Sequence, residues 1–259
     1  MAKTSIAGYD AEHVTIRGKD LVADLMGKVG FTELILLQLT GKTPTPSQVS
    51  ILDAVLVTIM EHGLVPSAIV TRLTHYGAPE SVQGAIVAGL LGVGDRFAGT
   101  ASECSQVLEK IVQVAAGDRV TVANEVVKDY RARKRPIPGF GHPVHRDVDP
   151  RSQRLIDIVK VAHAAGGGKG SNAAAGDYIA ALETLEQAVA TVIGKRIVTN
   201  VSAAIAAALC EAGVPSKAAR GIVLTARCAG LAGHLFEESE APTGDAMWSA
   251  VTDAVRYEP

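Results

Sequence analysis

The sequence predicts an all-α fold, and three observations support this class. Apolar residues recur at three- and four-residue spacing along most of the chain, as in helices that bury one face. Few segments alternate apolar and polar residues as strands do, which argues against an α/β sheet. Apolar residues make up 47% of the chain but aromatic residues only 4%, so we expect closely packed Ala, Val, Leu and Ile in the core.

Capping residues, glycines and prolines bound the expected elements. Residues 1–20 alternate weakly and are predicted to form a short strand or an arm. Asp20 and Ser47 are the expected N-caps of the first and third helices, because their side-chain oxygens can accept hydrogen bonds from free backbone N–H groups. Helices are predicted over residues 21–28, 31–39, 47–62, 67–74, 79–91, 102–116, 121–133, 152–165, 178–193, 202–212, 217–237 and 246–256.

Charge, cysteines and hydrophobic runs exclude several classes of protein. A net charge of −2 argues against a nucleic-acid-binding protein, although residues 131–135 form a local basic patch. Cys104, Cys210 and Cys228 are far apart and odd in number, which is typical of reduced cysteines. The chain has no long uncharged apolar run and no leader pattern, so we expect a cytoplasmic protein without membrane contact.

The loop at residues 131–151 holds the densest group of residues suited to binding and catalysis. It begins with a basic run that includes Arg135, and continues through Pro138-Gly-Phe-Gly-His142 to Pro150-Arg151. Its prolines and glycines predict a shaped loop between two helices. Since His, Arg and Asp gather here, the loop is a candidate site, with a solvated basic surface as the alternative.

Several motifs resemble those of citrate synthases. Residues 138–151 are similar to the family loop P-G-[FY]-G-H-x-V-x-x-x-x-D-P-R. Glu61-His62-Gly63 matches E-H-G, with Arg72 ten residues after His62. Asn200-Val-Ser202 is close to N-V-D. Further matches in the same order are residues 15–21, residues 31–44, and residues 226–237, which resemble A-R-x-x-G-x-x-A-H-x-x-E. Together they cover most of the chain.

Two features indicate a branch within this family. The chain lacks much of the N-terminal helical part of full citrate synthases. In addition, residues 94–99 (GDRFAG) resemble the G-D-R-F-G-G of the citryl-CoA lyase module at the end of ATP-citrate lyase. Citrate synthases have G-P-L-H-G-G there, so Phe97 stands in place of their catalytic His. The chain is therefore identified as a member of the superfamily similar to a stand-alone citryl-CoA lyase.

The resemblance implies an architecture, and the small residues of two helices predict an assembly. A larger helical domain is expected from residues 1–98 and 212–259, with a smaller helical domain from residues 99–211 inserted into it and the site in the cleft between them. We also expect a homodimer or a higher even oligomer. Small residues cover more than one face of the predicted helices 79–91 and 202–212, as a two-fold interface would allow. The alternative is a helix buried inside a monomer.

The implied reaction is retro-aldol cleavage of citryl-CoA, or of a related carboxylated 3-hydroxyacyl-CoA, to acetyl-CoA and oxaloacetate. His142 is expected to hydrogen-bond the substrate hydroxyl, and His62 to orient that hydroxyl or a carboxylate; the alternative for His62 is a charge at a helix C-terminus. Arg151 and Arg227 would bind substrate carboxylates, with an exposed helix Arg as the alternative for Arg227. Further expected substrate contacts come from Arg72, for which a structural ion pair is the alternative, and from Phe97.

Coenzyme A is expected to enter as part of the substrate, so neither a permanently bound cofactor nor a metal is predicted. Backbone groups of the glycine loop would surround the adenine, and nearby basic residues would bind the phosphates. The residues predicted to contact coenzyme A are Ile137, Pro138, Gly139, Phe140, Gly141, Arg135, Lys195 and Arg196.

Ser202 is the main departure from the family pattern, because it replaces the carboxylate that exchanges a proton with the acetyl methyl carbon. A hydroxyl is no base near neutral pH without activation. The candidates for a substitute base are Asp95, Asp147, Asp149, His145 and His75. Two other functions stay open: condensation of the citrate synthase type, and a catalytically reduced paralogue that binds CoA esters or dicarboxylates.

Overall fold

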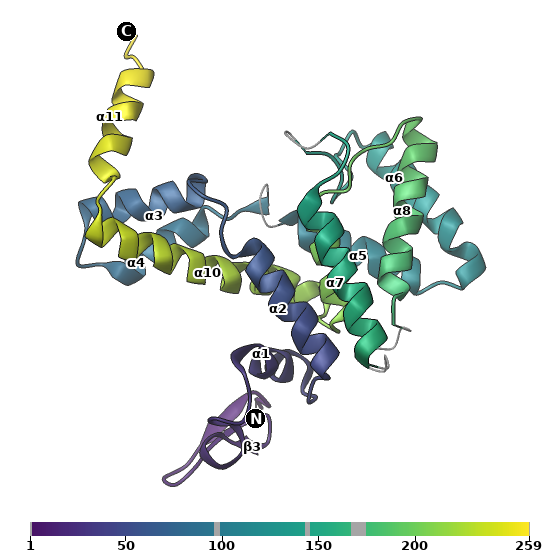
Figure 1. Cartoon of the computed structure of the whole chain (residues 1–259), viewed down its shortest axis with the longest axis horizontal. Helices are drawn as coiled ribbons and strands as arrows, with labels where there is room; N and C mark the ends of the chain where they lie inside the picture. The colour runs from purple at the N-terminus through teal and green to yellow at the C-terminus, as the bar shows by residue number, and fades with distance from the viewer. Residues whose placement is uncertain (1, 96–98, 143–145, 167–174, 259) are drawn as a thin grey trace. The chain divides into compact units, whose positions relative to one another are not determined.

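The computed structural model describes residues 2–95, 99–142, 146–166 and 175–258, and helices dominate them, which confirms the predicted all-α class. Figure 1 shows the succession of elements along the chain. The helices are α1 (Phe31–Thr40), α2 (Pro46–Met60), α3 (Pro66–Gly77), α4 (Val82–Leu91), α5 (Thr100–Val112), α6 (Arg119–Ala132), α7 (Pro150–Gly166), α8 (Asp177–Ile193), α9 (Val201–Glu211), α10 (Ser216–Glu240) and α11 (Gly244–Ala254).

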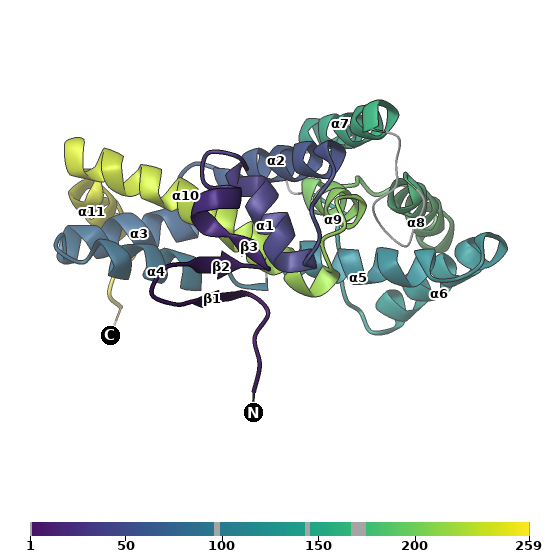
Figure 2. The same ribbon diagram turned by 90° about the horizontal axis from the view of Figure 1, so that it is seen from below.

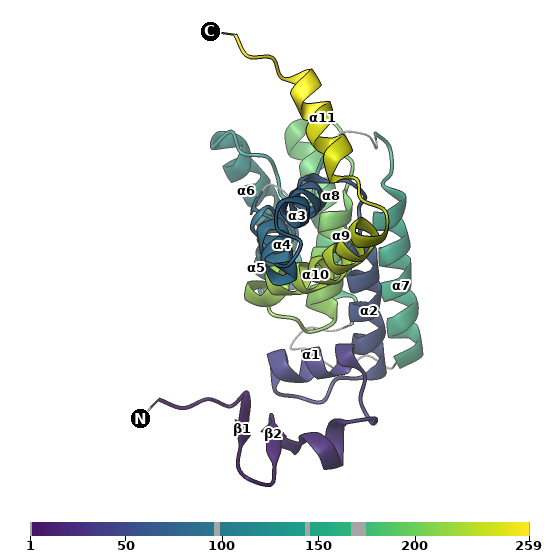
Figure 3. The ribbon, with the colours of Figure 1, turned by 90° about the vertical axis from the view of Figure 1, so that its left-hand side faces the viewer.

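The N-terminal segment forms a small antiparallel sheet, which agrees with the strand that was predicted there as one of two outcomes. Its strands β1 (Ala7–Tyr9), β2 (Val14–Ile16) and β3 (Lys19–Asp20) lie in that order, with Gly8 opposite Thr15. Figure 3 shows β1 and β2 side by side. A single π-helical turn, η1 (Leu21–Leu25), follows in place of the longer helix predicted over residues 21–28.

One predicted cap is confirmed and one is wrong. The Asp20 carboxylate accepts hydrogen bonds from the backbone N–H groups of Val22 and Ala23 at the start of η1. At α2 the cap is Thr45, whose hydroxyl accepts from the backbone N–H of Gln48, while the Gln48 side chain accepts from the backbone N–H of Thr45. This reciprocal capping box begins the helix before Ser47, which is buried inside its first turn.

The chain falls into two compact units. Unit 1 comprises residues 1–55 and 101–219, and unit 2 comprises residues 56–100 and 220–259. This division does not test the predicted domains, which have boundaries at residues 98 and 211 and a cleft between them. They stay predictions.

Unit 1 packs around α9, whose residues from Ala203 to Glu211 are all buried. Alanines on several faces of α9 let α7 and α8 approach closely, and α6 lies against α8 (Figures 1 and 2). The buried Glu211 carboxylate accepts hydrogen bonds from the backbone N–H groups of Tyr178 and Ile179, and it lies 2.9 Å from Nε2 of His163. The charge at the end of α9 thus caps the start of α8.

Unit 2 is built on the close packing of α3 against α4. At the crossing point Gly89 leaves room for Thr71, where any Cβ would overlap the Thr71 hydroxyl. Helix α11 packs on α3 through an edge-on contact between Tyr76 and Trp248, whose ring centroids are 6.2 Å apart. Among the residues that the structure describes, no helix combines the length and apolarity needed to cross a membrane.

Candidate active site

In unit 1 the glycine loop is fixed to the segment that leads into α9. The backbone N–H of Gly141 donates to the Val198 carbonyl at 2.8 Å, and the backbone N–H of Asn200 donates to the Gly139 carbonyl at 2.9 Å. Gly139 has a φ of +86°, and a Cβ there would lie 2.6 Å from the Ala203 Cβ. Only glycine meets both conditions, so the sequence sets how closely this loop approaches α9.

The buried carboxylate of Asp149 organises the rest of this site. It binds the Nε and Nη2 atoms of Arg151 at 3.1 and 2.9 Å, and it accepts a hydrogen bond from the backbone N–H of Val201 at 3.0 Å. Burial raises the pKa of Asp149, but the hydrogen bonds and charge of Arg151 outweigh burial and hold that pKa below its usual range. Asp149 is therefore an ionised structural anchor. Its oxygens are already bound, so it is a poor candidate for the missing base.

Arg151 also contacts the first of the predicted catalytic residues. Its Nη2 lies 3.3 Å from Nε2 of His142. A guanidinium only donates hydrogen bonds, so Nε2 of His142 is the acceptor, and a neutral His142 carries its proton on Nδ1. Asp149 occupies one edge of the Arg151 fork, and the Arg151 side chain is 31% exposed. Binding of a substrate carboxylate by Arg151 stays a prediction.

Ser202 lies in the first turn of α9, one residue after the Asp149 contact. The Asn200 side chain caps this helix by accepting from the backbone N–H of Ser202 at 3.0 Å. Asn200 also donates to the Gly141 carbonyl at 2.9 Å, which ties Ser202 to the glycine loop. The structure thus brings His142, Arg151 and Ser202 into one hydrogen-bonded segment of unit 1.

In unit 2 the candidate residues lie at the end of α2. His62 is exposed, and its backbone N–H donates to Oε1 of Glu61 at 2.7 Å. Arg227 lies nearby on α10, with Nη1 3.4 Å from the carbonyl of Met60. Burial lowers the pKa of Arg227, and the charge of Glu61 opposes that effect. The Arg227 side chain is thus partly buried, and its contact with a substrate carboxylate stays a prediction.

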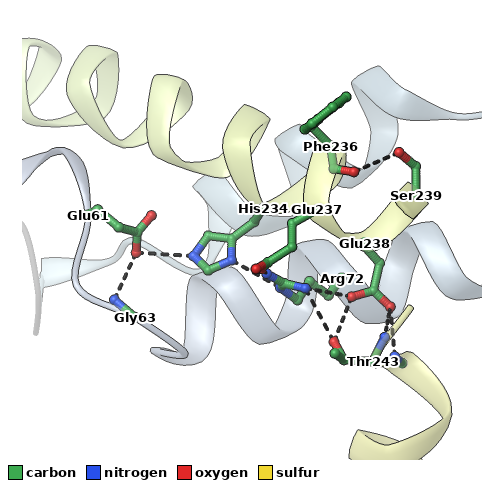
Figure 4. Close-up of polar contacts among 10 residues, drawn as sticks. Glu61, Gly63, Arg72, His234, Phe236, Glu237, Glu238, Ser239 and Thr243 are labelled. Atoms are coloured by element: carbon green, nitrogen blue, oxygen red, sulfur yellow. Dashed lines mark hydrogen bonds and ion pairs between the residues drawn. The ribbon is translucent and has the colours of Figure 1, made fainter. Parts of the chain in front are cut away.

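Arg72 makes the structural ion pairs that were its alternative interpretation. It is buried in unit 2, where Nη1 donates to Glu238 at 2.7 Å and Nη2 contacts Glu237. Its Nε donates to Nδ1 of His234 at 3.0 Å. Figure 4 shows these contacts converging on the guanidinium. Most of its donors therefore already have partners, and a direct contact with substrate stays a prediction.

The remaining predicted residues differ in exposure. Ile137, Pro138 and Gly139 are buried, Phe140 and Gly141 are partly buried, and Lys195 and Arg196 are exposed. Arg135 binds Glu103 at 2.7 Å and lies over the ring of Tyr130.

Phe97 and His145 lie outside the described residues. Of the other candidate bases, Asp95 is bound to Arg220 at 2.6 Å, and Asp147 is exposed.

The comparisons with known proteins identify the family. Residues 2–245 match the family described as "Citrate synthase, C-terminal domain". The chain belongs to this family. It is 27% identical to citrate synthase from Deinococcus radiodurans over 227 residues, covering 86% of this chain and 56% of that protein. The relative from Heyndrickxia coagulans is 24% identical, and 53% of it is covered. The chain thus spans about half the length of these citrate synthases.

Solved structures of the family extend the comparison. Citryl-CoA lyase from Hydrogenobacter thermophilus has a TM-score of 0.83 and 29% identity, over 100% of this chain and 95% of that chain. Citrate synthase from Thermotoga maritima shares the fold with a TM-score of 0.62 and 20% identity, over 89% of this chain and 57% of that chain. The likeness to the lyase spans both chains almost completely.

Glu61 and His234 hold family motifs in place but were not predicted to belong to the site, and Asp149 was predicted only as a possible substitute base and not as the anchor of Arg151. Asp149 precedes the matched Pro150-Arg151, Glu61 precedes the matched His62, and His234 lies in the segment that resembles A-R-x-x-G-x-x-A-H-x-x-E. Each was therefore inside a recognised motif. The sequence did offer a signal for them. Each is ionisable and lies in a motif whose other residues had been assigned a role.

Proposed function

We propose that this protein cleaves citryl-CoA, or a related carboxylated 3-hydroxyacyl-CoA, to acetyl-CoA and oxaloacetate. The observation that carries the proposal is the contact between Arg151 and His142, with both residues anchored through Asp149. It places a cation that can bind a carboxylate beside an imidazole that can accept a proton. The nearly complete likeness to a citryl-CoA lyase further supports cleavage over condensation.

The chemistry follows from the roles of these two side chains. A substrate carboxylate bound by Arg151 would draw its Nη2 away from Nε2 of His142, and the lone pair freed on Nε2 would then face the tertiary hydroxyl. His142 takes the hydroxyl proton, the carbon–carbon bond breaks, and its electrons move into the thioester enolate. The hydroxyl carbon becomes the ketone of oxaloacetate, and protonation of the enolate carbon gives acetyl-CoA. His62 and Arg227 are proposed to bind the substrate hydroxyl or its carboxylates.

Coenzyme A is proposed to arrive only as part of the substrate, with no permanently bound cofactor. The bent backbone of residues 137–141 is proposed to contact its adenine. Lys195 and Arg196 are exposed, and they precede the segment 198–200 that is hydrogen-bonded to the glycine loop. They are the proposed phosphate contacts. Arg135 is the third, although it already binds Glu103.

A binding protein without chemistry is the second candidate, and Ser202 favours it because no carboxylate stands at that position. A condensing enzyme is the third. Incubating the purified protein with citryl-CoA, while oxaloacetate and free thiol are followed, separates these functions. Cleavage releases oxaloacetate without thiol, hydrolysis releases thiol without oxaloacetate, and a binding protein releases neither. Condensation is seen as thiol release from acetyl-CoA and oxaloacetate.

We also propose that the chain forms a homodimer or a higher even oligomer. Helix α4 has Gln83 as its one polar side chain, yet Val82, Val87 and Leu91 are 49%, 53% and 80% exposed. Such a helix face is usually covered. Light scattering should therefore give a mass of at least twice the 26.8 kDa of one chain. A single-chain mass at micromolar concentration would contradict the proposal.

A further inference from the structure

A chain of contacts in unit 2 links a buried ion pair to the backbone around His62 (Figure 4). It starts at Arg72 on α3, whose Nε donates to Nδ1 of His234 on α10 at 3.0 Å. Because a guanidinium always donates, Nδ1 of His234 must carry a lone pair. A neutral His234 then has its proton on Nε2. Arg72 thereby selects one tautomer of His234.

The selected tautomer places its protonated Nε2 within ion-pair distance of Glu61, although the angle of this contact is not that of a hydrogen bond. Nε2 of His234 lies 3.1 Å from Oε1 of Glu61. The same oxygen accepts the backbone N–H groups of His62 at 2.7 Å and Gly63 at 2.8 Å. Burial raises the pKa of Glu61, but the His62 N–H, His234 and the Gly63 N–H outweigh burial and lower that pKa. The carboxylate therefore stays ionised and holds the turn that carries His62.

The end of this chain away from His62 is firmly anchored. Arg72 and Glu238 have side chains that are only 2% exposed, and they bind each other at 2.7 Å. Glu238 in turn accepts the backbone N–H groups of Thr243 and Gly244 at 2.7 Å, at the start of α11. His62 and Gly63, in contrast, are exposed. The contacts of a buried cluster thus extend to an exposed turn.

Close packing of α10 on the end of α2 supports the same connection. A Cβ at Gly230 would overlap the Met60 carbonyl and lie 2.9 Å from Oε2 of Glu61. Helix α10 therefore lies directly against the backbone from which His62 projects. Since His234 follows Gly230 by four residues, both lie on the same face of α10.

We propose that His234 is a positioning residue for His62. It acts through Glu61, and Arg72 fixes its tautomer. The His234 side chain is 10% exposed, so it is placed to support the turn and not to touch substrate. The catalytic part of this proposal rests on the proposed role of His62 in citryl-CoA cleavage. The structural part does not.

The first experiment tests the structural part without any activity. Nitrogen-15 spectra of the histidine rings should show Nδ1 of His234 unprotonated and Nε2 protonated, with this pattern lost in Arg72→Met. Backbone amide signals of His62 and Gly63 should shift in His234→Ala. They should not shift in His163→Ala, a matched control, because His163 pairs with Glu211 in unit 1. A proton on Nδ1 of His234, or unmoved amide signals in His234→Ala, would overturn the proposal.

The second experiment is a double-mutant cycle in the full protein. His234→Ala should lower kcat for citryl-CoA cleavage about 100-fold, since a small misplacement of a catalytic group costs about that much. His234→Gln should recover part of this loss, because its amide N–H can reach Glu61. In a His62→Ala background, His234→Ala should cause little further loss if it acts through His62. Fully additive losses would contradict the positioning role.

The two experiments also separate failure of this proposal from failure of the proposed function. If the wild-type protein leaves citryl-CoA intact while the ring and amide signals behave as expected, the positioning of His62 stands and the assigned reaction is wrong. If the protein cleaves citryl-CoA but His234→Ala retains full kcat, the reaction stands and the positioning role is wrong.

Discussion

The two predicted catalytic histidines are held in different ways in the two units. In unit 1, His142 is contacted directly by Arg151, and one buried carboxylate, Asp149, binds both Arg151 and the first turn of α9. In unit 2, His62 is held through its backbone by Glu61, which is 44% exposed. The buried charges lie further away, at Arg72 and Glu238.

This difference determines what a substitution can reveal. In unit 1 the carboxylate that stabilises the fold also orients the site, so stability and ligand binding should change together. In unit 2 the buried ion pair and the histidine turn are separated by His234, so stability and activity should be separable. The predictions below test that contrast.

The largest expected effect is on stability in unit 2. Arg72→Met should lower the free energy of unfolding by about 3–5 kcal/mol, because it leaves the buried Glu238 without its cation. Urea unfolding followed by circular dichroism measures the change. The matched control is Arg220→Met, since Arg220 pairs with Asp95, which is 88% exposed. The control should cost less than about 1 kcal/mol. Equal losses in the two variants would refute the assignment of Arg72 to the structural cluster.

The next effect is loss of stability in acid. Burial raises the pKa of Glu238, but hydrogen bonds from Thr243, Arg72 and backbone N–H groups outweigh it and lower that pKa from 4.5 to about 2. A depressed pKa stabilises the fold above the unfolded value, and this contribution is lost as the pH falls from 4.5 toward 2. The loss should be about 3 kcal/mol.

Glu238→Gln isolates this contribution from that of other carboxylates. Its free energy of unfolding should be lower than that of the wild type at pH 7, and should change less between pH 5 and pH 2. Unfolding curves at several pH values measure both quantities. An identical pH dependence in variant and wild type would show that Glu238 is not the carboxylate responsible.

A smaller effect is expected on ligand binding in unit 1. Arg151→Ala should weaken citrate binding about 30-fold, as for loss of a charge-assisted pair. Arg151→Lys should recover little, because one ammonium cannot replace both the Asp149 contacts and the substrate contact. Arg151→Ala should also reduce stability, since Asp149 is buried beside it.

Calorimetry with citrate and urea unfolding measure these two changes. Arg154→Ala is the matched control, because it removes the same charge from an exposed position one turn further along α7. It should leave citrate affinity unchanged. Equal citrate affinity in wild type and Arg151→Ala would place Arg151 outside the site.

How much the sequence could predict depended on the range of the interactions. Helices follow from local periodicity, so their existence was predictable. Ser47 was misjudged as a cap because Thr45 and Gln48 form a reciprocal pair that begins the helix earlier. Motif positions led to the prediction of His142, Arg151 and His62 as site residues, which stays a prediction. The partners of Arg72 are more than 160 residues away in sequence, so no local pattern could reveal its ion pairs.

The smallest expected effect concerns Ser202, which stands where the family has a proton-exchanging carboxylate. Ser202→Ala should change cleavage of citryl-CoA less than about tenfold, because a hydroxyl contributes only a modest hydrogen bond. Without that carboxylate, the wild type should show little hydrogen–deuterium exchange at the acetyl methyl group of acetyl-CoA in D2O. Water would then protonate the enolate during cleavage, and loss of a positioned acid typically costs about 10²–10⁴-fold.

Ser202→Asp should raise this methyl exchange, because it introduces a carboxylate at the position where the family has one. The introduced carboxylate would stand in the first turn of α9, where the backbone N–H groups of Val201 and Ser202 are already bound by Asp149 and Asn200. It would therefore lack those hydrogen bonds, while the helix dipole would still favour its ionised form. An ionised carboxylate can accept a proton from the methyl carbon, which a hydroxyl does not do near neutral pH. Ser202→Asn, which matches the shape without a charge, should leave exchange at the wild-type rate. If Ser202→Ala instead abolished cleavage at unchanged substrate affinity, the hydroxyl itself would take part, and water as the proton donor would be wrong.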